Sequence, residues 1–186
     1  MDLVGKMTAI AGHTMKMLAD FDAWLYVLLV RMEERLGLYK VARSISFTGD
    51  GYAYLLIAVL LLLLVPETGL AVTISGVVAF AMELPAYLVL KKGFRRRRPF
   101  NVVSALAPIH QPADEFSFPS GHAAAGFLMA YIVSHFFPLM VWPMYIWASL
   151  VGISRILLRV HFVSDVLAGI ALGTGIAILS LNILGY

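Results

Sequence analysis

The 186-residue chain contains no cysteine. This absence excludes disulfides, zinc sites built from thiolates and a cysteine nucleophile. Charged residues are scarce, at 13% of the chain, against about a quarter in typical soluble proteins. Hydrophobic residues make up 61%. The composition therefore indicates an integral membrane protein.

The start of the chain lacks the continuous apolar core that a cleavable signal peptide requires. Lys6, His13, Lys16 and Asp20 interrupt it. We therefore expect the membrane-spanning segments themselves to target the chain to the membrane.

Five apolar runs approach or exceed the length of a membrane-spanning helix. Each is expected to be helical, because lipid offers no hydrogen-bond partner to the backbone. We place them at residues 51–65, 70–90, 119–137, 139–158 and 162–184. Turns at 66–69, at Pro138 and near 159–161 would pair them as hairpins. The sequence predicts an all-α fold, a polytopic transmembrane helix bundle forming a single domain, 1–186.

The first 50 residues form an amphipathic N-terminal segment. The apolar run 21–32 would extend only about 18 Å as a helix, too short to cross a bilayer. Apolar residues recur every three or four positions, at Met7, Ala11, Met15, Leu18, Phe21, Leu25, Leu28 and Met32. This spacing favours a helix lying in the membrane interface. The alternative is a sixth, tilted span over residues 8–32, and in either case residues 44–50 turn the chain into the next helix.

The one long polar connection, 91–118, is the expected active-site loop. It begins with a basic run that includes Lys91 and Arg98. Basic residues at a membrane edge commonly anchor a protein to anionic headgroups. Guanidinium and ammonium groups also bind phosphate through charge-assisted hydrogen bonds. Both interpretations stay open, and different residues of the run can serve each.

A second cluster, Pro119-Ser120-Gly121-His122, opens the following span. Small residues at a helix N-terminus let backbone N–H groups approach an anion, which the helix dipole also favours. Ser120 could instead serve only as a helix cap. A histidine is unfavourable there as a permanent cation, so His122 suggests a titrating acid or base beside a bound anion.

A third cluster comprises Ser154, Arg155, His161 and Asp165. The last two residues are four positions apart and share one helical face, where the carboxylate can orient the imidazole. A buried structural ion pair is the alternative. A further charged residue, Glu83, lies in the second predicted span near Pro85 and either pairs with a basic residue or accepts hydrogen bonds freed at the proline kink.

The five spans would bring all three clusters to the same side of the membrane. Cationic groups, a helix N-terminus and two histidines would then meet where no pair of carboxylates for a metal ion is evident. This combination predicts a phosphoryl-transfer site that uses no metal and no cofactor.

These residues resemble the motifs of the type 2 phosphatidic acid phosphatase family, which shares its site with vanadium haloperoxidases and bacterial acid phosphatases. The first motif, lysine then six residues then Arg-Pro, falls on Lys91, Arg98 and Pro99. The second falls on residues 119–122 and the third on Ser154, Arg155, His161 and Asp165.

The resemblance implies that His161 attacks phosphorus, Asp165 orients it, and His122 protonates the leaving oxygen before activating water. Five residues would bind the phosphoryl oxygens: Lys91, Arg98, Ser120, Gly121 and Arg155. The family also implies six spans and an external site. All 14 lysines and arginines would lie on the active-site side, which by the positive-inside rule favours the cytoplasmic face.

We therefore expect a multi-pass lipid phosphatase, in a bacterial cytoplasmic membrane, acting on an isoprenyl diphosphate, phosphatidate or phosphatidylglycerol phosphate. The expected partners are this lipid phosphate and membrane lipids, and no nucleic acid. A lipid phosphotransferase with the same intermediate is one alternative, and a non-enzymatic membrane scaffold or transporter is another. The sequence leaves the oligomeric state open.

Overall fold

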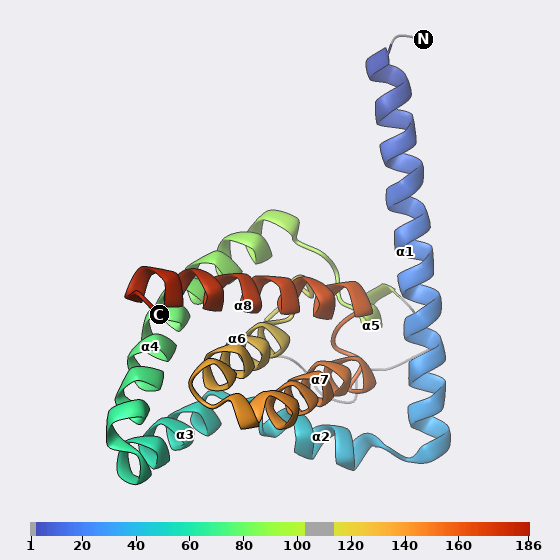
Figure 1. Ribbon diagram of the computed structural model, residues 1–186. Helices are drawn as coiled ribbons and strands as arrows, with labels where there is room; N and C mark the ends of the chain where they lie inside the picture. The colour runs from blue at the N-terminus through green and yellow to red at the C-terminus, as the bar shows by residue number, and fades with distance from the viewer. Residues whose placement is uncertain (1–2, 103–113) are drawn as a thin grey trace.

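The computed structural model describes residues 3–102 and 114–186 (Figure 1). Within them the regular structure is helical, apart from one isolated bridge between Arg97 and Phe116. The all-α class predicted from the sequence is confirmed. The helices are α1 (Leu3–Leu36), α2 (Tyr39–Phe47), α3 (Gly51–Leu64), α4 (Pro66–Phe94), α5 (Pro99–Val102), α6 (Gly121–Phe136), α7 (Val141–Leu157) and α8 (Val163–Leu184), with a 3-10 turn at Pro138–Met140.

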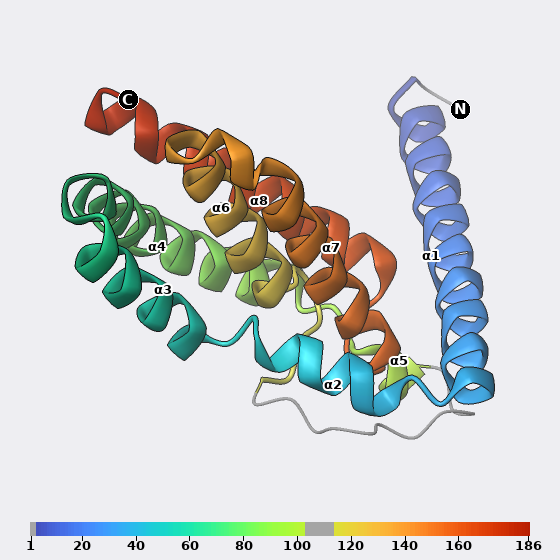
Figure 2. The ribbon, with the colours of Figure 1, turned by 60° about the horizontal axis from the view of Figure 1, so that its bottom comes forward.

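Helix α6 lies at the centre of the bundle, in contact with α4, α7 and α8. Figure 2 shows these helices side by side, with α2 across one end of the bundle and α1 standing along its edge. The α6–α8 contact depends on glycine. A Cβ atom at Gly173 would collide with the backbone of Ala124, and one at Gly169 with the backbone of Ser120. Small residues at helix interfaces allow this close approach in membrane proteins.

Three helical segments are long and apolar enough to cross a membrane: Pro66–Phe94, Pro138–Leu157 and Val163–Leu184. A fourth is added if α2 and α3, bent by 51°, count as one span. The predicted number of five is thus not confirmed. Helices α3 and α6 have 14 and 16 residues, whereas a bilayer crossing takes about 20. The apolar helices nevertheless make the chain an integral membrane protein.

Three predicted boundaries were wrong. Residues 66–69 are the first turn of α4 rather than a connection, because a proline suits the first helical position, where its missing N–H costs nothing. Residues 91–94 extend α4 into the predicted loop, and the helix ends at Arg95, whose φ of 47° is left-handed. Residues 44–47 belong to α2. Part of the predicted active-site loop, residues 103–113, lies outside the described residues.

Helix α1 is longer than either sequence-based alternative proposed. Its side chains up to residue 16, and Leu18, lie outside the described residues, and with them half of the predicted apolar stripe. Farther along, Tyr26 and Val30 are fully buried against the end of the bundle, and the Tyr26 ring meets that of Phe162 edge-on. Arg159 donates hydrogen bonds to Glu33 and Glu34 of α1. The C-terminal half of α1 is therefore docked on the segment that leads into α8.

Candidate active site

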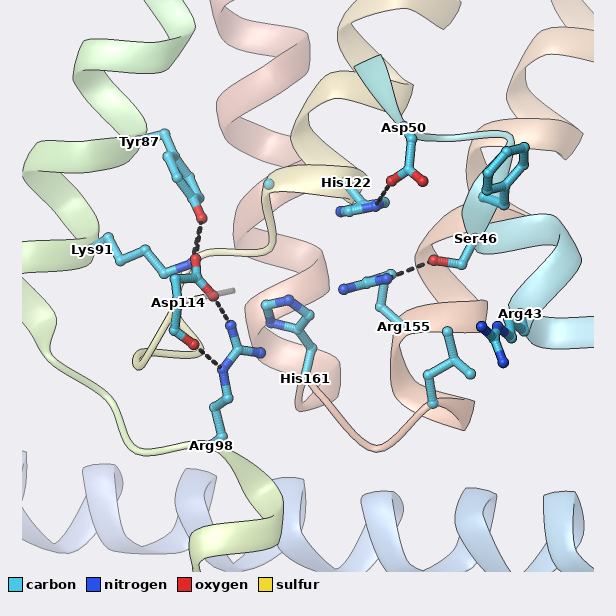
Figure 3. A pocket seen from close by; sticks show the side chains of 13 residues that line it. Arg43, Ser46, Asp50, Tyr87, Lys91, Arg98, Asp114, His122, Arg155 and His161 are labelled. Atoms are coloured by element: carbon cyan, nitrogen blue, oxygen red, sulfur yellow. Dashed lines mark hydrogen bonds and ion pairs between the residues drawn. The ribbon is translucent and has the colours of Figure 1, made fainter. Parts of the chain in front are cut away.

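One cavity of about 380 Å³ collects residues from all three sequence clusters. It opens between α2, α4, α6 and α7, and Figure 3 shows its side chains pointing toward a common centre. Six of the eight predicted site residues line it: Lys91, Arg98, Gly121, His122, Arg155 and His161. The other two, Ser120 and Asp165, are fully buried outside the cavity lining.

Four cationic side chains line the cavity, and three of them, Lys91, Arg98 and Arg155, are buried, each no more than 8% exposed, whereas Arg43 is exposed. Arg98 donates from Nη1 to the backbone oxygen of Val160 at 2.7 Å. Arg155 donates from Nη1 to Oγ of Ser46 at 2.5 Å, while its Nε has no partner among the described residues. These bonds fix the direction of both guanidinium groups, as a preorganised anion site requires.

Asp114 joins two of these cations. Its Oδ2 accepts hydrogen bonds from Lys91 Nζ and, at 2.8 Å, from the Tyr87 hydroxyl, while its Oδ1 accepts from Arg98 Nη2 (Figure 3). Burial by itself raises the pKa of the Asp114 carboxyl, but the bonds from Lys91 and Tyr87 outweigh it and leave that pKa below its usual range. The carboxylate is therefore ionised and neutralises part of the basic cluster.

His161 projects into the cavity from the segment between α7 and α8. Its Nδ1 lies 3.7 Å from Asp165 Oδ2, longer than a hydrogen bond. Burial lowers the pKa of the His161 imidazole to about 4, an effect that Asp165 opposes and Arg155 reinforces. The ring is consequently neutral at physiological pH, which is the state that a nitrogen nucleophile needs.

Asp165 is held by groups that the sequence motifs do not include. Its Oδ2 accepts a hydrogen bond from the backbone N–H of Phe162 at 2.8 Å, and its Oδ1 accepts one from Arg96 Nη1 at 2.8 Å. Arg96 also donates to Asp22 of α1 at 2.6 Å, and its guanidinium lies 4.3 Å from the centre of the Phe162 ring. Helix α1 is thereby linked to the carboxylate behind His161.

His122 has a carboxylate partner as well. Its Nε2 lies 2.8 Å from Oδ1 of Asp50, a residue in the connection between α2 and α3. The Tyr52 hydroxyl donates to the other oxygen of Asp50 at 2.7 Å. Sequence reasoning treated Asp50 only as part of a turn. An acidic residue between two glycines at a predicted span end was the available signal.

The second motif forms the start of α6, as expected. The backbone N–H of Ser120 donates to the backbone oxygen of Asp165 at 2.9 Å, which ties this helix end to α8. The Ser120 side chain makes no capping bond, and its Oγ is buried with no partner among the described residues. Across the same described ranges, no three His, Asp or Glu side chains gather as they would around a metal ion.

Sequence comparison relates this chain to known phosphatases. Decaprenylphosphoryl-5-phosphoribose phosphatase of Mycobacterium tuberculosis is 33% identical over 145 residues, 75% of this chain and 77% of that protein. Undecaprenyl-diphosphatase of Sulfolobus acidocaldarius is 33% identical over 137 residues, 72% of this chain and 65% of that protein.

Two solved structures share the fold. Aquifex aeolicus LpxE superposes with a TM-score of 0.74 and 27% identity, covering 85% of this chain and 93% of that one. The PAP2 type phosphatidylglycerolphosphate phosphatase of Bacillus subtilis superposes with a TM-score of 0.71 and 26% identity, covering 90% of this chain and 86% of that one. The family model of the PAP2 superfamily matches residues 51–186. The chain therefore belongs to the PAP2 superfamily and is a phosphatase.

Proposed function

We propose that this phosphatase removes the terminal phosphate of a lipid phosphate monoester or diphosphate through a phosphohistidine formed on His161, without a metal ion. The observation that carries the proposal is that His161 and His122 face one cavity together with three buried cations. The relatives are named for decaprenylphosphoryl-5-phosphoribose and undecaprenyl diphosphate, and one solved structure of the same fold is named for phosphatidylglycerolphosphate. An isoprenyl diphosphate, phosphatidate and phosphatidylglycerol phosphate are therefore the candidates.

The first step is attack on phosphorus. The Nδ1 side of His161 faces Asp165, so its Nε2 is the nitrogen available to the substrate. As the N–P bond forms and the P–O bond to the lipid breaks, positive charge develops on the imidazole and Asp165 stabilises it. Lys91, Arg98 and Arg155 hold the phosphoryl oxygens and stabilise the charge of the transition state.

His122 supplies the proton that the leaving oxygen needs. With Nε2 held by Asp50, Nδ1 is the atom that donates to the departing lipid alkoxide or phosphate. In the second step the same nitrogen takes a proton from water, which attacks the phosphohistidine and releases inorganic phosphate. Asp50 is thus a positioning residue, because it fixes the ring orientation of His122 and stabilises its protonated form.

For the membrane arrangement we propose that α3, α4, α6, α7 and α8 all cross the bilayer. Helix α6 is short, but α4, α7 and α8 surround it, so protein rather than lipid covers its ends. A locally thinner bilayer accommodates the short α3. The cavity then lies at one end of the bundle, within reach of a lipid headgroup.

The direct test is phosphate release by the purified protein in detergent micelles from a panel of lipid phosphates and diphosphates, with no lipid acceptor added. We expect inorganic phosphate from at least one of them, inhibition by orthovanadate and no inhibition by chelators. His161→Ala is expected to abolish release while keeping the thermal unfolding temperature of the parent protein. If phosphate transfer occurs only after a lipid alcohol is added, the chain is a phosphotransferase instead.

A further inference from the structure

The anion site of the cavity already holds an anion that belongs to the chain. The Asp114 carboxylate binds Lys91 and Arg98, the first-motif cations proposed to hold the substrate phosphate, and also the Tyr87 hydroxyl. A carboxylate and a phosphoryl group cannot take these donors at the same time, because each donor N–H points at one acceptor.

Asp114 is the most exposed of three carboxylates at the site. Its side chain is 42% exposed, against 33% for Asp50, and that of Asp165 is completely buried. The chain after Asp114 is fixed by the Arg97–Phe116 bridge and by the Ser117 N–H, which donates to the Arg96 carbonyl at 2.8 Å. The backbone can therefore stay in place while rotation about the side-chain bonds moves the carboxylate into water.

The carboxylate satisfies only part of the site. Nε of Arg155, a residue that lines the cavity, remains without a partner among the described residues. A carboxylate offers two oxygens, and so does the phosphate of a phosphodiester, which has two non-bridging oxygens and one negative charge. A terminal phosphate offers three oxygens and up to two charges.

We propose that Asp114 is an internal competitor that any ligand must displace, and that this cost leaves the phosphodiesters of surrounding lipids unbound while terminal phosphates, which bind more strongly, still occupy the site. The proposal rests on the function proposed above and names a specificity-determining residue for it. Exchanging one monoanion for another gains little Coulomb energy, whereas a dianion with a third oxygen gains both charge and hydrogen bonds. Bilayer phospholipids would otherwise occupy the site, because their concentration at the membrane is high.

Calorimetric titration of the detergent-solubilised protein tests this without relying on turnover. The probes are inorganic phosphate at about pH 8, where it is mainly a dianion, and dimethyl phosphate as a monoanionic diester. Asp114→Asn keeps the shape of the side chain and removes its charge. Glu115→Gln is the matched control, because Glu115 is exposed and lines a different cavity.

We expect Asp114→Asn to bind both probes about tenfold more tightly, the scale of one charge-assisted hydrogen bond, because both displace the same carboxylate. Glu115→Gln should match the parent protein. Unchanged or weaker binding of the probes in Asp114→Asn would overturn the proposal, because the carboxylate would then only align the cations. If Asp114→Asn binds the probes more tightly but the parent protein releases no phosphate from any lipid phosphate, the proposed function fails while the competition by Asp114 stands.

Discussion

Oδ1 of Asp50 lies 2.8 Å from Nε2 of His122, although 72 positions separate the two residues in the chain. The site therefore contains two histidine–carboxylate pairs, since Nδ1 of His161 lies 3.7 Å from Oδ2 of Asp165. The two pairs have different roles in the proposed mechanism. Asp165 supports His161 as the nucleophile, and Asp50 supports His122 in proton transfer.

Asp50→Asn tests this division through the leaving group. An alkoxide leaving group needs a proton in the transition state, and losing a positioned acid costs about 10²–10⁴-fold. We expect kcat/KM for a lipid phosphate monoester to fall within that range. An aryl phosphate whose phenolate leaves unprotonated should lose far less, because it bypasses the acid. Tyr52→Phe removes a bond to Asp50 without changing its charge, and its effect should be small. Equal losses on both substrates would show that Asp50 only supports the fold.

A second prediction concerns the contact between α6 and α8. Gly173→Ala would place a methyl group against the Ala124 backbone, and such overpacking costs about 1–3 kcal/mol. Gly175→Ala is the control on the same helix, because nothing lies within 4 Å of its Cβ position. Thermal unfolding in detergent should show a lowered midpoint for Gly173→Ala and an unchanged or raised midpoint for Gly175→Ala. Equal midpoints would mean that the two helices are not in the close contact described.

A third prediction follows from the low pKa of His161, about 4 in the folded protein. Because the unfolded imidazole titrates near pH 6.5, the unfolded state binds a proton that the folded state excludes. Stability is therefore intact above pH 6.5 and falls as the pH drops toward 4, by up to about 3 kcal/mol for this group. His161→Gln should lose less stability than the parent protein over this window. If the unfolding temperatures of the parent protein and His161→Gln fall in parallel as the pH drops, the folded imidazole binds the proton as readily as the unfolded one and the prediction is wrong.

Six of the eight residues predicted from the motifs line one cavity, Lys91 and His122 among them. The shared helical face predicted for His161 and Asp165 was wrong, because α8 begins at Val163 and His161 lies before it. The partners of these residues were not predictable from the motifs. Asp50 meets His122, and Arg96 meets Asp165, only through the packing of separate helices.

The ends of the helices were also not predictable from local sequence patterns alone. Pro66 follows an apolar run and reads as a turn, yet it begins α4 because the chain reverses within the single residue Val65. Asp114 lies in the predicted polar loop and matches none of the motifs. Its bonds to Lys91 and Arg98 are tertiary contacts, which no local pattern encodes.

A labelling experiment tests whether His161 carries the phosphoryl group. Protein incubated with substrate labelled in the terminal phosphate is quenched, and the bound label is tested for the acid lability and alkali stability of a phosphohistidine. His122→Asn with an aryl phosphate should accumulate the label, because water is no longer activated to remove it. His161→Asn should carry none. Label that persists on His161→Asn would contradict the account, as would phosphate release by that variant at the parent rate.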